Sequence, residues 1–370
     1  MKTRAALFHQ PNQPLRIEEL ELDEPKRGEV RVKMVAVGLC RSDHNVMVGS
    51  RPVGMTPMVL GHEGAGIIDA VGPGVTGIEP GDHVVLMFIP SCGVCANCIS
   101  GRTHSCVWSA NIAKGPLIDG TYRLHDKEGR KVGQFCLVGA FSQYAVVSRH
   151  SVCLIDKSFP LQAACLVGCG VVGGYGAAVN RAGVGPGDTV LVIGVGGIGM
   201  NIVQGAKIAG ATTVIAVDIH DHKLAWARGF GATHTINAEK GDVAAMAMEI
   251  TGGSGVDFAF EAISRPSSIA QAYDATAKSG TVVIVGLTPS NYDSLPISPL
   301  NLVLTQKTLM GTLYGTSNAL VEIPKLLQMY GQGQLKLDEL VTATYSLDQI
   351  NQGYEDMVSG KNIRGVLTFE

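Results

Sequence analysis

The sequence has no excess of basic residues, no apolar run long enough to span a bilayer, and no internal repeat. With 29 Lys and Arg against 32 Asp and Glu, the formal net charge at pH 7 is −3. This balance provides no electrostatic footprint for nucleic acid or for an anionic membrane surface. Near the N-terminus the only apolar run is residues 5–8, which is too short for a signal peptide. We therefore expect a cytoplasmic protein that binds neither nucleic acid nor membrane.

Nine cysteines occur in the 370 residues, without an export signal that would direct them to an oxidising compartment. Cysteines in such a chain are more often reduced thiols or metal ligands than disulfide partners. The length is sufficient for two domains, each with its own core. The 47 glycines form no periodic or Gly/Ser-rich tract, so they indicate tight turns and close approaches of the backbone.

A strand–turn–helix–strand pattern occupies residues 189–218. Apolar, β-branched residues at 190–193 predict a buried strand, and a G-x-G-x-x-G turn follows it. A helical pattern then leads to a second apolar strand that ends at an aspartate. Such a unit holds a pyrophosphate at the turn and the helix N-terminus, and its terminal Asp accepts hydrogen bonds from a ribose. We therefore predict a dinucleotide site formed by Gly194, Gly196, Gly197, Ile198, Gly199 and Asp218.

The same alternation of strand and helix continues to about residue 312. Strands are predicted at 189–193, 213–217, 256–260 and 281–285, and helices near 198–209, 221–229, 241–250 and 266–277. This rhythm is typical of a doubly wound parallel sheet with helices on both faces.

The chain before this region is β-rich. Short apolar or alternating runs predict strands at 29–37, 65–71, 83–87 and 141–147. Two amphipathic helices, near 319–330 and 347–358, and a strand at 364–369 close the chain, and we expect them to return to the first domain. The prediction is an α/β protein with a β-rich catalytic domain at 1–170, a dinucleotide-binding domain at 171–313 and a C-terminal return at 314–370.

Four cysteines lie close together in the pattern C-x2-C-x2-C-x7-C, at Cys92, Cys95, Cys98 and Cys106. Four thiolates at this density can close a tetrahedral zinc shell with no open position, which is a structural site. An iron–sulfur cluster is the alternative, but the seven-residue gap and the missing proline disfavour it. The acidic balance of the chain disfavours a zinc ribbon that binds nucleic acid.

A second set of metal donors is spread over the first 170 residues. Cys40, His62 and Cys169 are the pieces of a Cys2His zinc site with one position open, although each residue alone could be a buried structural side chain. His62 and Cys169 stand between glycines, so that backbone can crowd around them. Cys169 also directly precedes the nucleotide-binding domain, where we expect a ligand cleft.

At these motifs the chain resembles the zinc-dependent medium-chain alcohol dehydrogenases from end to end. The GHEGAG segment at 61–66, the four-cysteine segment, LVGCG at 166–170 and the GVGGIG turn occur in the order and spacing of that family. More loosely, GVGGIGMNIVQGAKIAGA and YEDMVSGKNIRGV resemble the bacterial nicotinoprotein members, which hold NAD(H) tightly and pass electrons to a nitroso dye. The resemblance implies a GroES-like first domain and a Rossmann second domain.

The resemblance also implies roles for residues around the predicted zinc. Cys40, His62 and Cys169 would hold the catalytic ion, and Glu63 would be an alternative ligand. Asp43 would hydrogen-bond the second nitrogen of His62. Five further residues complete the implied site. Ser42 would be the proton acceptor and Phe88 would line the substrate pocket. Arg41 and Arg364 would contact the pyrophosphate, and Lys223 would lie beside Asp218 at the ribose.

The chain departs from the family pattern at two positions. Asn45 occupies the place of the relay histidine of the animal enzymes, and His44 comes one residue earlier, so we expect His44 to take the proton from Ser42. Gly173 stands where many relatives have a threonine beside the nicotinamide. We also expect a long loop between Trp108 and Ser142, as in dimeric members of the family.

These observations predict a homodimeric or homotetrameric enzyme that transfers hydride between a primary alcohol or its aldehyde and NAD. The carboxylate of Asp218 would repel a 2′-phosphate, which favours NAD over NADP. The two donor sets predict two zinc ions per chain. The alternatives are a thiol-adduct formaldehyde dehydrogenase, a polyol dehydrogenase on the same scaffold, or a non-catalytic zinc-binding structural protein.

Overall fold

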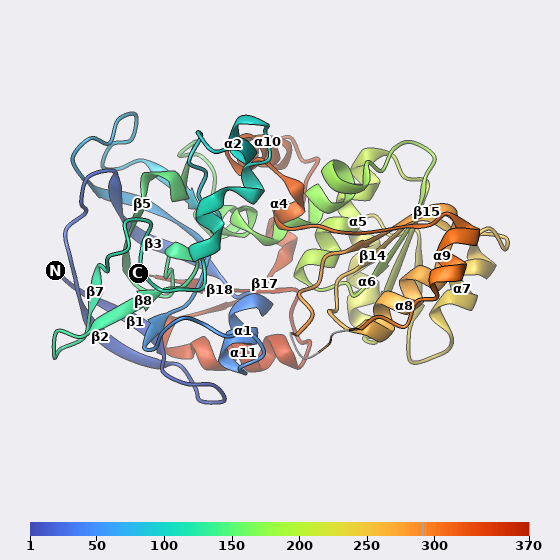
Figure 1. Cartoon of the computed structure of the whole chain (residues 1–370), viewed down its shortest axis with the longest axis horizontal. Coiled ribbons are helices and arrows are strands. Elements are labelled where there is room, and N and C mark those ends of the chain that lie inside the picture. Colours follow the sequence, from blue (N-terminus) through green and yellow to red (C-terminus); the bar gives the residue numbers. More distant parts are fainter. Residues whose placement is uncertain (290–291, 293, 370) are drawn as a thin grey trace. The chain divides into compact units, whose positions relative to one another are not determined.

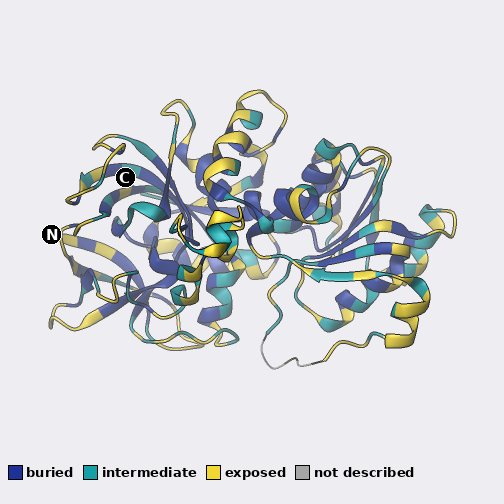
Figure 2. Ribbon diagram, turned by 45° about the horizontal axis from the view of Figure 1, so that its top comes forward, coloured by how far each residue is buried: buried dark blue, intermediate teal, exposed yellow. Residues whose placement is uncertain are grey.

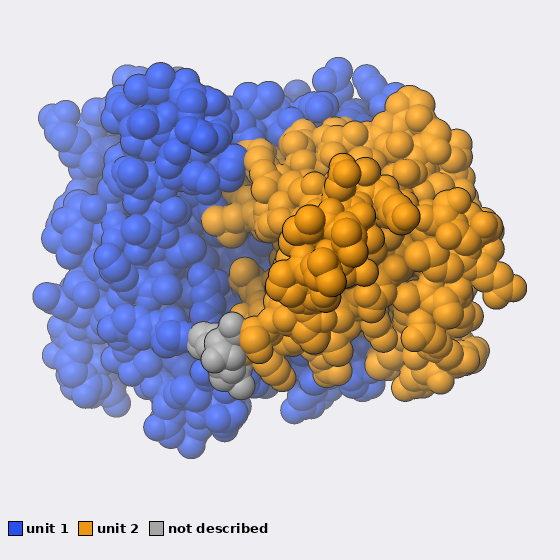
Figure 3. Space-filling view, turned by 45° about the vertical axis from the view of Figure 1, so that its right-hand side comes forward, with its two compact units in different colours: residues 1–170, 318–370 blue, residues 171–317 orange. Residues whose placement is uncertain are grey.

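The structure is a computed structural model that describes residues 1–289, 292 and 294–369, which form two compact units (Figures 1 and 3). The first unit combines Met1–Gly170 with Asn318–Glu370, and the second is Val171–Ser317. The chain thus leaves the first unit once and returns to it.

The first unit contains a small closed barrel and a larger mixed sheet. The barrel has the strand order β1 (Lys2–Phe8), β2 (Arg16–Leu22), β7 (Leu124–His125), β8 (Lys131–Gln134) and β4 (Met58–Val59). The sheet has the order β10 (Val152–Ile155), β6 (His83–Leu86), β5 (Glu63–Val71), β3 (Glu29–Gly38), β18 (Arg364–Thr368) and β17 (Val341–Tyr345), and β9 (Tyr144–Ser148) also pairs with β3. All four strands predicted before residue 150 are present.

The C-terminal strand β18 pairs antiparallel with β3, with Val366 opposite Gly38. Three helices of this unit are short: α1 (Arg41–Met47), α2 (Ala96–Ile99) and α3 (Leu161–Ala164). Two longer helices precede β17 and β18, namely α10 (Ala319–Gly331) and α11 (Ile350–Val358). In α11, Ile350, Gly353 and Tyr354 are buried, and this spacing forms one apolar face. The predicted C-terminal helices and the closing strand are therefore present.

The second unit is built on one parallel sheet of six strands. Its order is β13 (His234–Asn237), β12 (Thr213–Asp218), β11 (Thr189–Ile193), β14 (Val256–Glu261), β15 (Thr276–Ile284) and β16 (Thr308–Gly311). In chain order this is 3-2-1-4-5-6, the doubly wound arrangement that binds dinucleotides. The helices are α4 (Gly170–Gly176), α5 (Gly197–Ala209), α6 (Asp221–Gly229), α7 (Val243–Ile250), α8 (Pro266–Ala275) and α9 (Pro299–Thr305). The predicted fold class is confirmed.

Burial explains why these segments are strands. Val190, Leu191, Val192 and Ile193 of β11 are all buried, as expected for a central parallel strand covered on both faces. Figure 2 shows the dark blue of buried residues along the strands and yellow along the outer faces of the helices. Among the described residues no single helix is long and apolar enough to cross a membrane, although the bent pair Leu161–Gly168 and Gly170–Ala182 passes when counted together.

The expected long loop between Trp108 and Ser142 is wrong in part. The segment contains β7 and β8, which pair with each other and complete the barrel through β2 and β4. Each of these strands is too short to leave a periodic signal in the sequence, and only the pairing with distant strands defines them.

Candidate metal and nucleotide sites

The four cysteines of the 92–106 segment converge at one point. Their sulfur atoms all lie within 4.8 Å of one another. Backbone N–H groups already point at two of them, since Cys95 donates to Sγ of Cys92 at 3.2 Å and Cys92 donates to Sγ of Cys106 at 3.4 Å. A hydrogen bond from the Val107 backbone lowers the pKa of Cys95 to about 6. Four clustered sulfurs, two of which accept hydrogen bonds from backbone N–H groups, fit a tetrahedral thiolate metal site.

The second donor set also comes together, although its members are far apart in the sequence. Cys40, His62, Glu63 and Cys169 are all buried, with one donor atom of each within 4.8 Å of the others. The pairing of β3 with β5 places Gly38 opposite Glu63, so the end of one strand meets the start of the other. Cys40 lies two residues after β3, His62 directly precedes β5, and Glu63 is the first residue of β5. Two thiols, an imidazole and a carboxylate in one buried cluster are suitable zinc ligands.

Asp43 orients the imidazole of His62. Its Oδ2 lies 3.0 Å from Nδ1, and its Oδ1 accepts a hydrogen bond from the backbone N–H of Gly61 at 2.9 Å. Both side chains are buried, and although burial opposes it, the charges of Asp43 and Cys40 raise the pKa of His62 well above its usual value. With Nδ1 held by a carboxylate, Nε2 is the nitrogen left for a metal, which is the usual pattern of a ligating histidine.

Glu63 is paired with Arg364, which the family resemblance assigned to the pyrophosphate. The guanidinium of Arg364 donates to Oε2 of Glu63 and, at 3.0 Å, to the carbonyl oxygen of Leu39. Burial raises the pKa of Glu63 to about 8, against the opposing charge of Arg364. Oε1 of Glu63 is buried and has no hydrogen-bond partner among the described residues, so it can turn to a metal. A contact between Arg364 and a cofactor stays a prediction.

Two glycines make this ion pair possible. A Cβ at Gly38 would clash with Oε2 of Glu63, and one at Gly170 would clash with the guanidinium of Arg364. A side chain at either position would have to displace one of the charged groups of the pair, so glycine suits both positions.

Helix α1 carries the other residues predicted to act near the metal. Arg41 is exposed, Ser42 and His44 are half-buried, and no hydrogen bond joins the Ser42 hydroxyl to His44 in the part of the chain that the structure describes. Burial, and then the charge of Arg41, lowers the pKa of His44. Phe88 stands edge-on to His62 with 5.4 Å between ring centroids, so it lines the metal cluster.

Two aromatic residues near the cluster were missed by the sequence analysis. Phe135 packs edge-on to His62 at 6.0 Å, and Tyr354 lies 6.1 Å from the ring of His44. Phe135 belongs to the segment that was expected to be a loop. Tyr354 lies on the buried face of α11, and the apolar spacing of that helix was the only available signal.

In the second unit, the glycine turn has the conformation that nucleotide binding requires. Gly194 has φ +92°, a backbone conformation that glycine adopts readily. A Cβ at Gly199 would clash with the carbonyl oxygen of Gly194. Nothing lies within 4 Å of the Cβ position of Gly196, so a ligand can approach the backbone there. Helix α5 starts at the next residue and directs its free N–H groups to the turn.

Asp218 lies at the end of β12 beside this turn. Its Oδ2 accepts from the N–H of Val195 at 3.1 Å, and its Oδ1 accepts from those of Ile219 and His220 at 2.8 and 3.1 Å. The carboxylate is thus fixed by backbone of both segments and remains half-exposed. Lys223 follows on α6 and is also half-exposed. This arrangement suits a ribose diol.

Comparisons with known proteins agree with both halves of the chain. Residues 26–157 match the family model of the alcohol dehydrogenase GroES-like domain, and residues 197–330 match that of the zinc-binding dehydrogenases. The chain is 46% identical over 369 residues to the NDMA-dependent alcohol dehydrogenase of Amycolatopsis methanolica, covering 99% of each protein.

Solved structures give the same result. An alcohol dehydrogenase zinc-binding domain protein from Burkholderia ambifaria has a TM-score of 0.95 at 37% identity, covering 100% of this chain and 99% of that one. The benzyl alcohol dehydrogenase of Acinetobacter calcoaceticus has a TM-score of 0.94 at 33% identity, with 100% of both chains covered. These matches define the class as a two-domain zinc-binding dehydrogenase. Within it, the chain belongs to the zinc-dependent medium-chain alcohol dehydrogenase family and is an oxidoreductase, as its motifs predicted.

Proposed function

We propose that this enzyme transfers hydride between a primary alcohol, or its aldehyde, and NAD. The observation that carries the proposal is the buried cluster of Cys40, His62, Glu63 and Cys169. A zinc ion held by these donors would supply Lewis-acid chemistry that lowers the pKa of a bound hydroxyl. The chain does the rest: Asp43 orients His62, and Arg364 pairs with Glu63 beside the cluster.

Proton removal is assigned to helix α1. Ser42 would accept the hydroxyl proton and His44 would pass it outward, because both are half-buried and lie just beyond Cys40. The apolar ring of Phe88 favours a substrate with an apolar group next to the hydroxyl. Asp218 supports NAD over NADP, since a fixed carboxylate repels a 2′-phosphate.

We propose two zinc ions per chain, and the two donor clusters support this count. The four-cysteine cluster has no carboxylate or imidazole among its donors and would act as a structural site. Metal analysis of the purified protein tests this count, and one zinc per chain would contradict it.

We propose further that NAD(H) stays bound during purification. The relative from Amycolatopsis methanolica is named as an NDMA-dependent enzyme, and the resemblance of this chain's motifs to the nicotinoproteins supports the same proposal. Analysis of the supernatant after denaturation would detect the nucleotide, and its absence would contradict this proposal.

The enzyme is proposed to be a homodimer or homotetramer. Helix α9 exposes Leu300, Val303 and Leu304 by 68, 72 and 70%, and the neighbouring strand β16 is an edge strand in the described part of the sheet. Exposed apolar residues beside an open strand edge are typical of a surface that another subunit covers. Light scattering on the purified enzyme tests the subunit number.

A substrate panel tests the proposed reaction. The zinc-replete enzyme is assayed with primary alcohols and NAD, and with a nitroso dye as acceptor in case the nucleotide does not exchange. Turnover of simple alcohols supports the proposal. Turnover of formaldehyde only with glutathione or mycothiol, or of polyols alone, would assign the enzyme to the alternative dehydrogenases. Inactivity with every substrate at full zinc occupancy would indicate a structural protein.

A further inference from the structure

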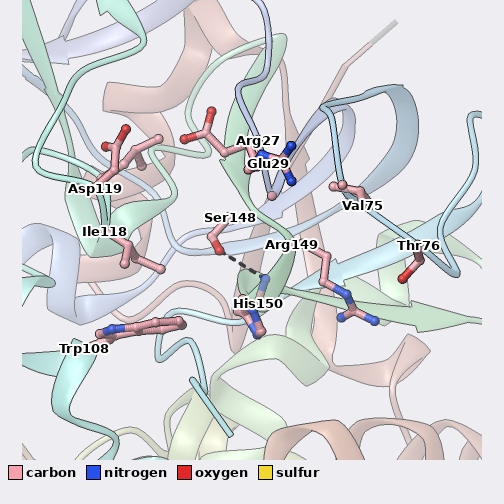
Figure 4. A pocket seen from close by; sticks show the side chains of 13 residues that line it. Arg27, Glu29, Val75, Thr76, Trp108, Ile118, Asp119, Ser148, Arg149 and His150 are labelled. Carbon is pink, nitrogen blue, oxygen red and sulfur yellow. Dashed lines mark hydrogen bonds between the residues drawn. The ribbon is translucent and has the colours of Figure 1, made fainter. Parts of the chain in front are cut away.

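A cavity of about 410 Å³ lies in the first unit, and none of its lining residues belongs to either metal cluster. It is lined by the segments 27–29, 74–76, 117–119 and 148–150 and by Trp108 (Figure 4). Small-molecule sites in proteins usually measure about 300–1,000 Å³. The cavity is therefore large enough for a small organic ligand, and the proposed reaction makes no use of it.

Two arginines that face this cavity have no carboxylate partner. Among the described residues, neither Arg27 nor Arg149 forms an ion pair, although both line the cavity. Gly74 leaves room for the Arg27 side chain, since a Cβ at this position would lie only 3.0 Å from a guanidinium nitrogen. In Figure 4, Arg27 lies near the top centre beside Glu29, Arg149 lies lower and to the right, and Trp108 and Ile118 lie on the left. Two uncompensated guanidinium groups at one cavity favour an anionic ligand.

The two carboxylates that line the cavity, Glu29 and Asp119, are already paired with another arginine. Glu29 accepts from the buried Arg123 at 2.5 and 2.8 Å, and Asp119 accepts from the same guanidinium at 2.7 Å. The three guanidinium groups and two carboxylates around the cavity leave a net charge of one positive unit. Such a wall suits a monoanion better than a dianion, since the second charge would meet the carboxylates.

Another part of the lining is aromatic and apolar. Trp108 and His150 pack edge to face with 5.3 Å between their ring centroids, and Leu117 and Ile118 also line the cavity. Burial, followed by the charge of Arg149, lowers the pKa of His150, which favours the neutral form of this ring. A planar hydrophobic group would pack well against these side chains.

We propose that this cavity binds a small aromatic monocarboxylate. Its carboxylate pairs with Arg27 and Arg149, and its ring packs against Trp108. The guanidinium fork matches a carboxylate through two parallel hydrogen bonds, and the aromatic wall selects a ligand with a flat apolar body. Neither the catalytic cluster nor the nucleotide turn is part of this site.

Trp108 provides a direct probe of binding, because the chain has only one other tryptophan, Trp226. In the Trp226→Phe variant, we expect benzoate to change the Trp108 fluorescence and to saturate. Benzamide, which has the same shape without the charge, and inorganic phosphate are expected to bind about tenfold more weakly. Arg149→Gln, added to the same background, is expected to weaken benzoate binding by about tenfold.

The matched control is Arg130→Gln, since Arg130 is exposed and paired with Asp126 and Glu128 away from the cavity. Its benzoate affinity should not change. If Arg149→Gln does not fold, Arg27→Gln replaces it, because Arg27 is exposed. The same tenfold loss of benzoate affinity is expected for this variant. The proposal is overturned if benzamide binds as tightly as benzoate, or if the folded arginine variants retain full affinity, as they would for benzoate bound at the catalytic cluster.

Discussion

Oδ2 of Asp43 lies 3.0 Å from Nδ1 of His62, and both side chains are buried. The other carboxylate oxygen is held by the backbone N–H of Gly61, the residue that directly precedes His62. One carboxylate therefore positions both the imidazole and the backbone next to it. This relationship decides which ring nitrogen is available to a metal, and the following predictions begin from it.

Asp43→Asn should weaken zinc binding at the Cys40–His62–Cys169 cluster. An amide can still accept from Gly61, but it carries no charge to hold His62 in the required tautomer. We expect zinc affinity to fall by about 10–100-fold, measured by competition with a chelator. Asp348→Asn is the control, because Asp348 is exposed and pairs only with Arg4 in the described structure. Equal zinc retention in both variants would contradict this role of Asp43.

Arg364→Gln should destabilise the first unit, because it leaves Glu63 buried without its cation. Removing one partner of a buried ion pair costs about 3–5 kcal/mol. We expect a lower urea midpoint for this variant and a partial recovery in Glu63→Gln/Arg364→Gln, where neither charge remains. If the double variant is no more stable than Arg364→Gln, the pair does not account for the loss. The Kd for NAD, measured on the same variants, tests the separate prediction that Arg364 contacts the cofactor.

Asp218→Asn should shift the cofactor preference towards NADP. The change removes the charge that would repel a 2′-phosphate but retains an acceptor for the Val195 N–H. We expect the ratio of the Kd values for NAD and NADP to change by about tenfold, or about 1.4 kcal/mol. Asp221→Asn on α6 serves as the control, since Asp221 is exposed and pairs with Lys240. An unchanged ratio in Asp218→Asn would show that specificity resides elsewhere.

Gly199→Ala should abolish tight nucleotide binding while the sheet still folds. The new Cβ would clash with the Gly194 carbonyl oxygen and push α5 away from the turn. Gly229→Ala is matched to it, because nothing lies within 4 Å of that Cβ position at the end of α6. We expect Gly229→Ala to bind NAD normally and to be as stable as the parent or more so. Isothermal titration with NAD distinguishes the two, and equal affinities would refute the close-approach argument.

Acidification should weaken the network around Arg123. Burial opposes it, but hydrogen bonds from Thr121 and Arg123 lower the pKa of Asp119 to about 2 in the folded protein. Because the folded pKa lies below the usual value of about 3.9, the carboxylate stabilises the fold above that pH, and the contribution disappears as pH falls towards 2. Asp119→Asn should therefore be less stable than the parent at neutral pH and equal to it near pH 2. A difference in urea midpoint that does not vary with pH would contradict this.

The local parts of the site could be predicted because their chemistry lies in short spacings. The turn at Gly194–Gly199 needs glycine at defined positions, and the four cysteines need to be close together, so both leave a pattern in a few residues. The partner of Arg364 could not be predicted in this way. Glu63 is far from it in the chain, and the two side chains meet because β18 and β5 both pair with β3.

The cavity beside Trp108 left no pattern in the sequence at all. Arg27, Trp108 and Arg149 come from three separate segments, and each looks like an ordinary solvated or packing residue when read alone. Only the structure shows that Glu29 and Asp119 are occupied by Arg123, while the neighbouring arginines face the cavity without carboxylates.

The sequence by itself determined the family and the doubly wound sheet, and it predicted both sets of candidate metal donors, because residue type and short-range spacing carry that information. Tertiary structure decided which donors meet, which charges are compensated and where a cavity remains. Those properties depend on strand pairing between distant segments, and the chain does not record such contacts in any local spacing.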